Sequence, residues 1–177
     1  MVTSTVKAGT TTKPRKMRRE PATDEVVMVK STETSVINFA DIYRLGPTER
    51  IDIIKRGVPA GVVVKLAKTI DRPKERLFKV LGLPRATVDR KMRANQRLSI
   101  EQGERVIGFS KLVGQVQVMV EQSGDPRGFD PAKWVADWLD RPLPALGGRC
   151  SADYMDTAEG QELISNLLAK MQSGAYA

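Results

Sequence analysis

Cations gather in one stretch of this 177-residue chain, in a pattern suited to holding an anionic polymer. Residues 72–97 contain nine Lys or Arg against two acidic residues. Repulsion within such a density of like charge destabilises the folded protein unless solvent screens it or an anionic partner neutralises it. Lys and Arg donate hydrogen bonds to phosphate oxygens, and Arg also reads the edges of bases. The residues of this stretch that we expect to contact DNA are Arg76, Arg85, Thr87, Arg90, Lys91 and Arg93.

Two short helices with a tight turn between them are expected to position these side chains. The sequence predicts a helix over 74–81, a turn at Gly82 and a second helix over about 85–94, which is the spacing of a helix-turn-helix. Glycine permits the left-handed turn. In this motif the early residues of the second helix face base edges and its later cations face phosphate. Phe78 departs from the motif, which commonly has a small residue there, and a merely solvated charged face is the alternative interpretation.

Several kinds of catalytic chemistry lack the residues they require. The chain has no His and one Cys, so it has no near-neutral proton shuttle and no internal disulfide. We expect Cys150 to be a free thiol in a reducing compartment, because a catalytic thiolate normally has a base or cation beside it. We find no phosphate-binding glycine loop and no carboxylate cluster for a metal. The sequence therefore predicts no enzymatic activity, no metal and no cofactor.

The two halves of the chain differ in charge. Residues 41–98 carry fifteen Lys or Arg against six acids, whereas residues 99–177 carry seven against eleven. The basic half suits a phosphate backbone, and the acidic half suits a partner with a cationic cleft. No apolar run approaches the roughly 20 residues that cross a bilayer, and the N-terminus has no hydrophobic signal core. We expect a cytoplasmic protein.

Proline, glycine and capping residues divide most of the chain into helices. Ser99 and Gln102 have the form of a capping box before the longest predicted helix, and Asp130 followed by Pro131 is typical of another helix start. Further helices are expected to begin at Pro47, at Pro59 and after a cap within residues 156–159. The expected fold is mainly all-α, with a helix-turn-helix DNA-binding lobe and a small helical C-terminal lobe.

We divide the chain into four parts, which are a flexible basic arm (1–21), a helix-turn-helix domain (44–98), a connecting helix (99–125) and a C-terminal domain (126–177). The arm is either an unstructured leader or a source of nonspecific DNA contacts. For residues 26–29 and 35–42 the sequence does not decide between short strands and extended segments. The apolar face of the helix over 99–122 is either a dimer surface or part of the core.

The C-terminal region combines several motifs in a fixed order. They are Trp138-Leu139-Asp140, Leu146-Gly147-Gly148, Asp153-Tyr154-Met155-Asp156-Thr157, Gly160, a Leu/Ile-rich helix and Gly174-Ala175-Tyr176. This order resembles the toxin-binding domain of the Xre/MbcA/ParS antitoxins, and the preceding helices extend the resemblance over most of residues 73–177. The resemblance implies a neutralising protein rather than an enzyme. Its implied partners are an NAD-degrading RES-domain toxin and operator DNA, bound by a homodimer that represses its own operon.

The resemblance also implies that the C-terminal region lies over the entrance to the toxin's active site. The residues expected to bind the toxin are Leu146, Tyr154, Met155, Gly174, Tyr176 and Ala177. The ring of Tyr176 and the terminal carboxylate are expected to occupy the place of the dinucleotide, although a frayed terminus is the alternative. Trp138 and the Leu163/Leu167 stripe are expected in the core. The Gly147–Gly148 pair is expected to allow close backbone approach.

A second interpretation keeps the DNA-binding half and changes the role of the C-terminal half. A stand-alone transcription regulator would use the C-terminal lobe for dimerisation or for binding an effector. It accounts for every basic residue of the helix-turn-helix but not for the ordered C-terminal motifs. Co-purification of a small enzyme encoded beside the protein separates the two interpretations.

Overall fold

A computed structural model describes Met1 and residues 38–174 of the chain. The described residues from 38 onward belong to one compact unit, Val36–Ala177. Our predictions for residues 1–21 and 26–29, and for Tyr176 and Ala177, lie outside the described residues.

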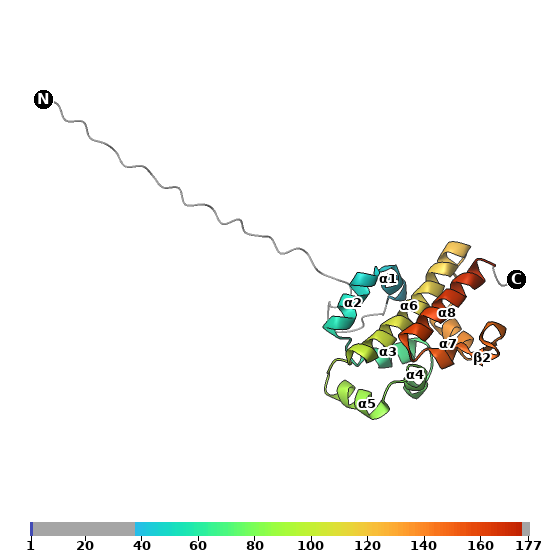
Figure 1. The fold of residues 1–177 in the computed structure, drawn as a ribbon, viewed down its shortest axis with the longest axis horizontal. Helices are drawn as coiled ribbons and strands as arrows, with labels where there is room; N and C mark the ends of the chain where they lie inside the picture. The colour runs from blue at the N-terminus through green and yellow to red at the C-terminus, as the bar shows by residue number, and fades with distance from the viewer. Residues whose placement is uncertain (2–37, 175–177) are drawn as a thin grey trace. The chain divides into compact units, whose positions relative to one another are not determined.

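Most of the described residues are helical, which confirms the predicted mainly all-α class (Figure 1). The eight α-helices among them are α1 (Phe39–Arg44), α2 (Pro47–Arg56), α3 (Val62–Thr69), α4 (Lys74–Val80), α5 (Arg85–Arg93), α6 (Ile100–Ser123), α7 (Pro131–Leu139) and α8 (Ala158–Gln172). A small antiparallel hairpin and two 3-10 turns connect α7 to α8. They are β1 (Pro142–Leu143), η1 (Pro144–Leu146), β2 (Arg149–Cys150) and η2 (Ser151–Tyr154).

The two strongest predicted helix starts are confirmed. Ser99 Oγ accepts a hydrogen bond from Gln102 N at 3.3 Å, and Gln102 Oε1 accepts one from Ser99 N at 3.1 Å, so the capping box begins α6. Asp130 Oδ1 accepts hydrogen bonds from two amides in the first turn of α7, both at 3.1 Å. These side chains satisfy backbone donors that have no partner within their helix.

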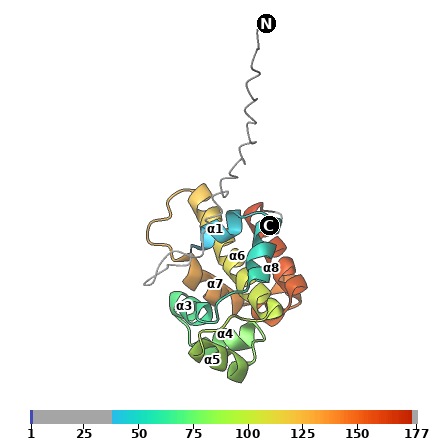
Figure 2. The same ribbon diagram turned by 90° about the vertical axis from the view of Figure 1, so that its left-hand side faces the viewer.

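Helix α6 lies at the centre of the fold. Helices α1, α2, α7 and α8 all pack against it, and the two views show it running through the middle of the unit (Figures 1 and 2). Its predicted apolar residues Val106, Phe109 and Val113 are at most 1% exposed. Ile107 and Leu112, on other sides of the helix, are also buried. The face that we considered as a dimer surface is therefore core, because helices of the same chain cover it.

Helix α1 crosses α6 in direct backbone contact. A Cβ atom added to Gly114 of α6 would lie 1.9 Å from the carbonyl oxygen of Phe39, so only glycine fits there. Asn38 caps α1 by accepting a hydrogen bond from Asp41 N at 3.3 Å. Residues 39–42 are thus helical, rather than a strand or an extended segment. Burial of Phe39 against the long helix, which local sequence does not reveal, accounts for the difference.

An extended connection replaces the predicted start of the third helix. Backbone hydrogen bonds of 3.0 and 2.8 Å join residues 58–60 to residues 96–98, and Pro59 forms an isolated antiparallel bridge with Arg97. Helix α3 consequently begins at Val62 and not at Pro59. The same pairing ties the segment after α5 to the segment before α3, which fixes both ends of the α3–α5 region.

Candidate nucleic-acid and protein interfaces

The turn between α4 and α5 has the geometry expected of a helix-turn-helix. Gly82 has φ +56°, in the left-handed region that glycine adopts readily. Val88 of α5 is fully buried beneath the turn. Phe78, which takes the place of the usual small residue, is also buried, and the ammonium of Lys74 lies 5.9 Å from its ring centroid. Both helices therefore bury an apolar side chain at the turn despite the larger residue at position 78.

Helix α5 lies at one end of the compact unit (Figures 1 and 2). Most of its cations are exposed. Arg85, Arg90 and Arg93 are exposed, whereas Thr87 and Lys91 are half-buried. Three of the residues predicted to contact DNA are thus presented together by one helix. This arrangement supplies the side chains that a duplex requires of a reading helix, with arginine forks available for base edges or phosphates.

Lys91 and Arg76, two further residues predicted to contact DNA, pair with residues outside α5. The ammonium of Lys91 lies 3.3 Å from Gln102 Oε1, on the side of α5 that faces α6. Arg76 belongs to α4, and its guanidinium pairs with the carboxylate of Asp140 at the end of α7. Arg76 therefore faces the C-terminal part of the unit and does not join the exposed arginines of α5.

Arg85, the first residue of α5, belongs to a cluster of four charged side chains. Arg85 Nη2 lies 3.3 Å from Glu75 Oε1, and Arg85 Nε lies 3.7 Å from Asp89 Oδ2. Lys74 Nζ donates to the other oxygen of Asp89 at 2.7 Å. This hydrogen bond from Lys74 holds the pKa of the Asp89 carboxyl below its ordinary value. Our sequence analysis missed both acids, although the i,i+4 spacing of Arg85 and Asp89 was a usable signal.

Ion pairs join the segment around α4 to helix α7. Besides the Arg76–Asp140 pair, Arg72 pairs with Asp137, and Lys133 Nζ lies 3.3 Å from Asp71 Oδ2. Beside these pairs lies a small cavity, and its apolar lining consists of the buried residues Ile70, Leu77, Val80, Phe109, Ala136 and Leu139. The helix-turn-helix and the helix that leads into the C-terminal hairpin are consequently parts of one packed body.

The hairpin between α7 and α8 presents the predicted residue Leu146 at its outer end. Pro142 pairs with Cys150 and Leu143 with Arg149, and Leu146 is half-buried. The glycines after it have φ of +65° and +81°, and a Cβ on either would meet nothing within 4 Å. The Gly147–Gly148 pair thus serves the left-handed turn, and our prediction of close backbone approach does not hold within the chain.

Residues 154–157 have different roles. Tyr154 is half-buried and so keeps part of its surface available to a partner, but Met155 is 0% exposed. The folded protein does not offer Met155 for a direct toxin contact, which corrects that prediction. Asp156 is exposed and is not the cap of α8, because Thr157 Oγ1 accepts the hydrogen bond from Gly160 N at 3.0 Å.

Helix α8 exposes part of the apolar stripe that we assigned to the core. Leu167 is buried, but Leu163, at one edge of the stripe, is 47% exposed, and Met171, in the last turn of the helix, is 43% exposed. Trp138, by contrast, is buried as predicted. Gly174 follows the helix with φ +71°, which confirms that glycine ends it.

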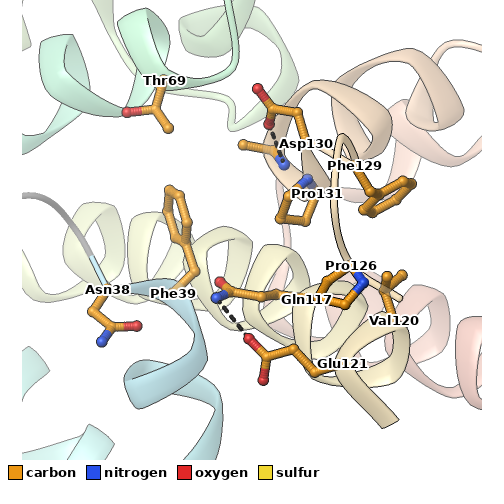
Figure 3. A pocket seen from close by; sticks show the side chains of 11 residues that line it. Asn38, Phe39, Thr69, Gln117, Val120, Glu121, Pro126, Phe129, Asp130 and Pro131 are labelled. Carbon is orange, nitrogen blue, oxygen red and sulfur yellow. Dashed lines mark hydrogen bonds between the residues drawn. The ribbon is translucent and has the colours of Figure 1, made fainter. Parts of the chain in front are cut away.

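A cavity among the described residues lies away from these surfaces. It measures about 550 Å³ and lies between α1, α6 and the start of α7, with Phe39 and Phe129 on opposite sides of the view (Figure 3). Neighbours already satisfy its side-chain groups in part, since Gln117 Nε2 donates to Glu121 Oε1 at 3.1 Å. Of the described residues that we expected to bind DNA or a toxin, none lines this cavity.

Among residues 1 and 38–174, no three His, Cys, Asp or Glu side chains are grouped so that they could hold a metal ion. None of the helices in the same residues is long and apolar enough to cross a membrane.

The fold and its surfaces define a helical DNA-binding protein whose reading helices are packed against a second helical region. Residues 49–111 match the family model of the antitoxin Xre-like helix-turn-helix domain. Residues 128–174 match the family model of the antitoxin Xre/MbcA/ParS C-terminal toxin-binding domain. The chain belongs to the Xre/MbcA/ParS family of antitoxins, as its C-terminal motifs indicated.

Two relatives align over most of the chain. It is 46% identical over 139 residues to a Prs ADP-ribosylating antitoxin of Sphingobium sp. (strain YBL2), covering 78% of this chain and 87% of that protein. It is 25% identical over 129 residues to an antitoxin Xre of Yersinia enterocolitica serotype O:8 / biotype 1B (strain NCTC 13174 / 8081), covering 73% of this chain and 82% of that protein.

Proposed function

We propose that this antitoxin neutralises an NAD-consuming RES-domain toxin by covering the toxin's active site, and that it represses its own operon by binding operator DNA as a dimer. The observation that carries the proposal is the placement of two binding surfaces on one body. Exposed arginines of α5 lie in the part that matches the helix-turn-helix domain, and the hairpin and α8 lie in the part that matches the toxin-binding domain.

The use of NAD by the toxin is supported by the Sphingobium relative. The name of that relative joins an antitoxin with ADP-ribosylation, a reaction in which NAD is the donor. By analogy the partner of this chain binds NAD, and it either transfers ADP-ribose to a target or hydrolyses NAD. Covering the NAD site of the toxin would explain neutralisation whichever reaction the toxin catalyses. Mass spectrometry of proteins incubated with the free toxin and NAD distinguishes the transfer of ADP-ribose from the hydrolysis of NAD.

Within this proposal the chain divides as the sequence suggested. Residues 1–21 form the arm, 44–98 the DNA-binding domain, 99–125 the central helix and 126–177 the toxin-binding domain. Leu146, Tyr154, Gly174, Tyr176 and Ala177 contact the toxin, while Arg85, Thr87, Arg90 and Arg93 contact the operator. Because the apolar faces of α6 are covered, the homodimer uses another surface, with two reading helices about 34 Å apart on successive turns of DNA.

Removing one exposed arginine of α5 tests the DNA-binding half. We expect Arg85→Ala and Arg90→Ala each to weaken operator binding by between about fivefold and 150-fold, because each loses a fork of donors to a base or phosphate. Toxin neutralisation is expected to stay intact. Fluorescence anisotropy with operator DNA, at one fixed salt concentration, measures the effect.

A matched control removes an arginine from another surface. Arg127 is in the segment before α7 and pairs with Asp125, so Arg127→Ala changes the net charge equally without touching α5. The assignment of α5 fails if the variants at positions 85 and 90 bind the operator as tightly as Arg127→Ala does.

A charge at the outer end of the hairpin tests the toxin-binding half. We expect Leu146→Asp to weaken the toxin complex roughly 30-fold, because a carboxylate would be desolvated where an apolar side chain is expected to enter the partner. Ile51→Asp is the control, since Ile51 is a similarly apolar exposed residue on α2. Isothermal titration of toxin into each variant measures the affinity, and equal affinities would remove Leu146 from the interface.

Isolation from the host tests the choice of partner. The tagged protein is expected to bring down a small enzyme encoded beside it, and the purified chain alone is expected to consume no NAD. A chain that binds its operator but brings down no neighbouring product would favour a stand-alone regulator.

A further inference from the structure

The only two acids in the basic stretch of residues 72–97 both lie beside the same arginine. Glu75 comes from α4 and Asp89 from α5, and each is within 4 Å of the Arg85 guanidinium. Acids on a surface that meets DNA repel phosphate and lower the affinity for any duplex. Their presence on both sides of one reading arginine therefore calls for a function other than attraction to the backbone.

Glu75 and Asp89 approach different nitrogen atoms of the Arg85 guanidinium. Glu75 approaches Nη2 at 3.3 Å, and Asp89 approaches Nε at 3.7 Å, a distance of an ion pair rather than of a hydrogen bond. A planar group held at two of its nitrogens has a restricted orientation. Nη1 takes part in neither contact, and the side chain is 66% exposed. The two ion pairs thus favour one orientation of the guanidinium before any ligand arrives.

Asp89 is the fixed member of this arrangement. Its side chain is 18% exposed, and its second oxygen accepts the 2.7 Å hydrogen bond from Lys74 of the preceding helix. Glu75 is 43% exposed and has more freedom. The position of Asp89 is therefore restrained by its hydrogen bond to α4, and its other oxygen lies beside Arg85.

We propose that Asp89 is a positioning residue that, together with Glu75, directs Arg85 toward the edge of a guanine and so sets the base preference of the antitoxin. This inference rests on the proposed binding of operator DNA through α5. Arginine reads guanine by donating two parallel hydrogen bonds to O6 and N7, which requires a fixed plane. The two acids lower the affinity for all duplexes. They raise the preference for a guanine at the position that meets the oriented Arg85 guanidinium.

The test compares base preference with overall affinity in the full-length protein. Randomised duplexes selected by the wild-type protein identify the preferred site, and Arg85→Ala identifies the position at which preference is lost. Asp89→Asn is expected to reduce the preference for guanine at that position roughly tenfold, while affinity for an unrelated duplex stays the same or rises. A merely structural role of Asp89 would instead weaken binding to both duplexes equally.

Lys74→Gln and Glu75→Gln make the test specific. Lys74→Gln removes the hydrogen bond that fixes Asp89 but leaves its carboxylate beside Arg85, so it is expected to reduce the guanine preference by less than Asp89→Asn does. Glu75→Gln alters the more exposed acid and is expected to reduce the preference in the same direction as Asp89→Asn. If thermal melting shows Asp89→Asn to be unfolded, Glu75→Gln decides the question.

Three results would overturn the inference. The first is an unchanged guanine preference in the folded Asp89→Asn protein, and the second is an equal loss of affinity for both duplexes. The third is a wild-type protein that selects no sequence, which would also remove the proposed operator binding. In the first two results operator binding stands and only the role of Asp89 is lost.

Discussion

Replacing Gly114 by alanine is expected to lower the free energy of unfolding by about 3 kcal/mol or more, with a fall in Tm of roughly 6–12 °C. The added Cβ would lie 1.9 Å from the carbonyl oxygen of Phe39 and 2.5 Å from its carbonyl carbon. Both atoms belong to the backbone of α1, so no side-chain rotation relieves the overlap. The two helices would have to separate, which opens the apolar contact between them.

Gly61→Ala is the matched control for this prediction. Gly61 has a φ of −60°, and a Cβ added there would meet nothing within 4 Å. Its replacement is expected to change the free energy of unfolding by less than about 1 kcal/mol, because alanine adopts this backbone conformation without strain. Urea denaturation followed by circular dichroism compares the variants. Equal stability of the two would show that α1 does not cross α6 as closely as described.

Deleting residues 174–177 is expected to release the toxin while leaving DNA binding unchanged. The deletion removes the glycine that ends α8, together with the tail that we propose to occupy the NAD entrance. Loss of an aromatic anchor and a charge-assisted contact predicts a complex weakened roughly 30-fold or more. NAD consumption by the toxin, titrated with full-length or shortened antitoxin, provides the measurement.

The appropriate control retains the tail and lacks operator affinity. Arg90→Ala should inhibit the toxin as the unaltered protein does, whereas the shortened protein should bind operator DNA normally and fail to inhibit. Complete inhibition by the shortened protein, at equal concentration, would show that the hairpin and α8 suffice and that the tail is a frayed terminus.

Features governed by neighbouring residues were predictable from the sequence. The capping box at Ser99, the Asp130 cap and the glycine turn at Gly82 each depend on a few adjacent residues, and all three are confirmed. The ends of most helices followed from the same signals. The reading helix was found in this way, because its apolar spacing and its glycine turn belong to one short stretch of chain.

Features governed by distant contacts were not predictable. Helix α1 forms where Phe39 meets Gly114, and the pairing of Arg76 with Asp140 joins residues 64 positions apart. An apolar stripe likewise does not reveal which of its edges is covered, so Leu163 was assigned to the core and is exposed. The motif around Met155 was attributed to a partner, although the side chain fills the protein's own interior.

The central position of α6 limits how this antitoxin can be recombined with its relatives. Because α7 and α8 rest on the same long helix as α1 and α2, a chimera joined after residue 124 would set one protein's C-terminal helices on another protein's α6. Exchange of toxin specificity therefore requires transfer of α6 together with the C-terminal helices. The residues of α1 and α2 that touch α6 must then be matched to it, so partner choice and DNA recognition are expected to be inherited together.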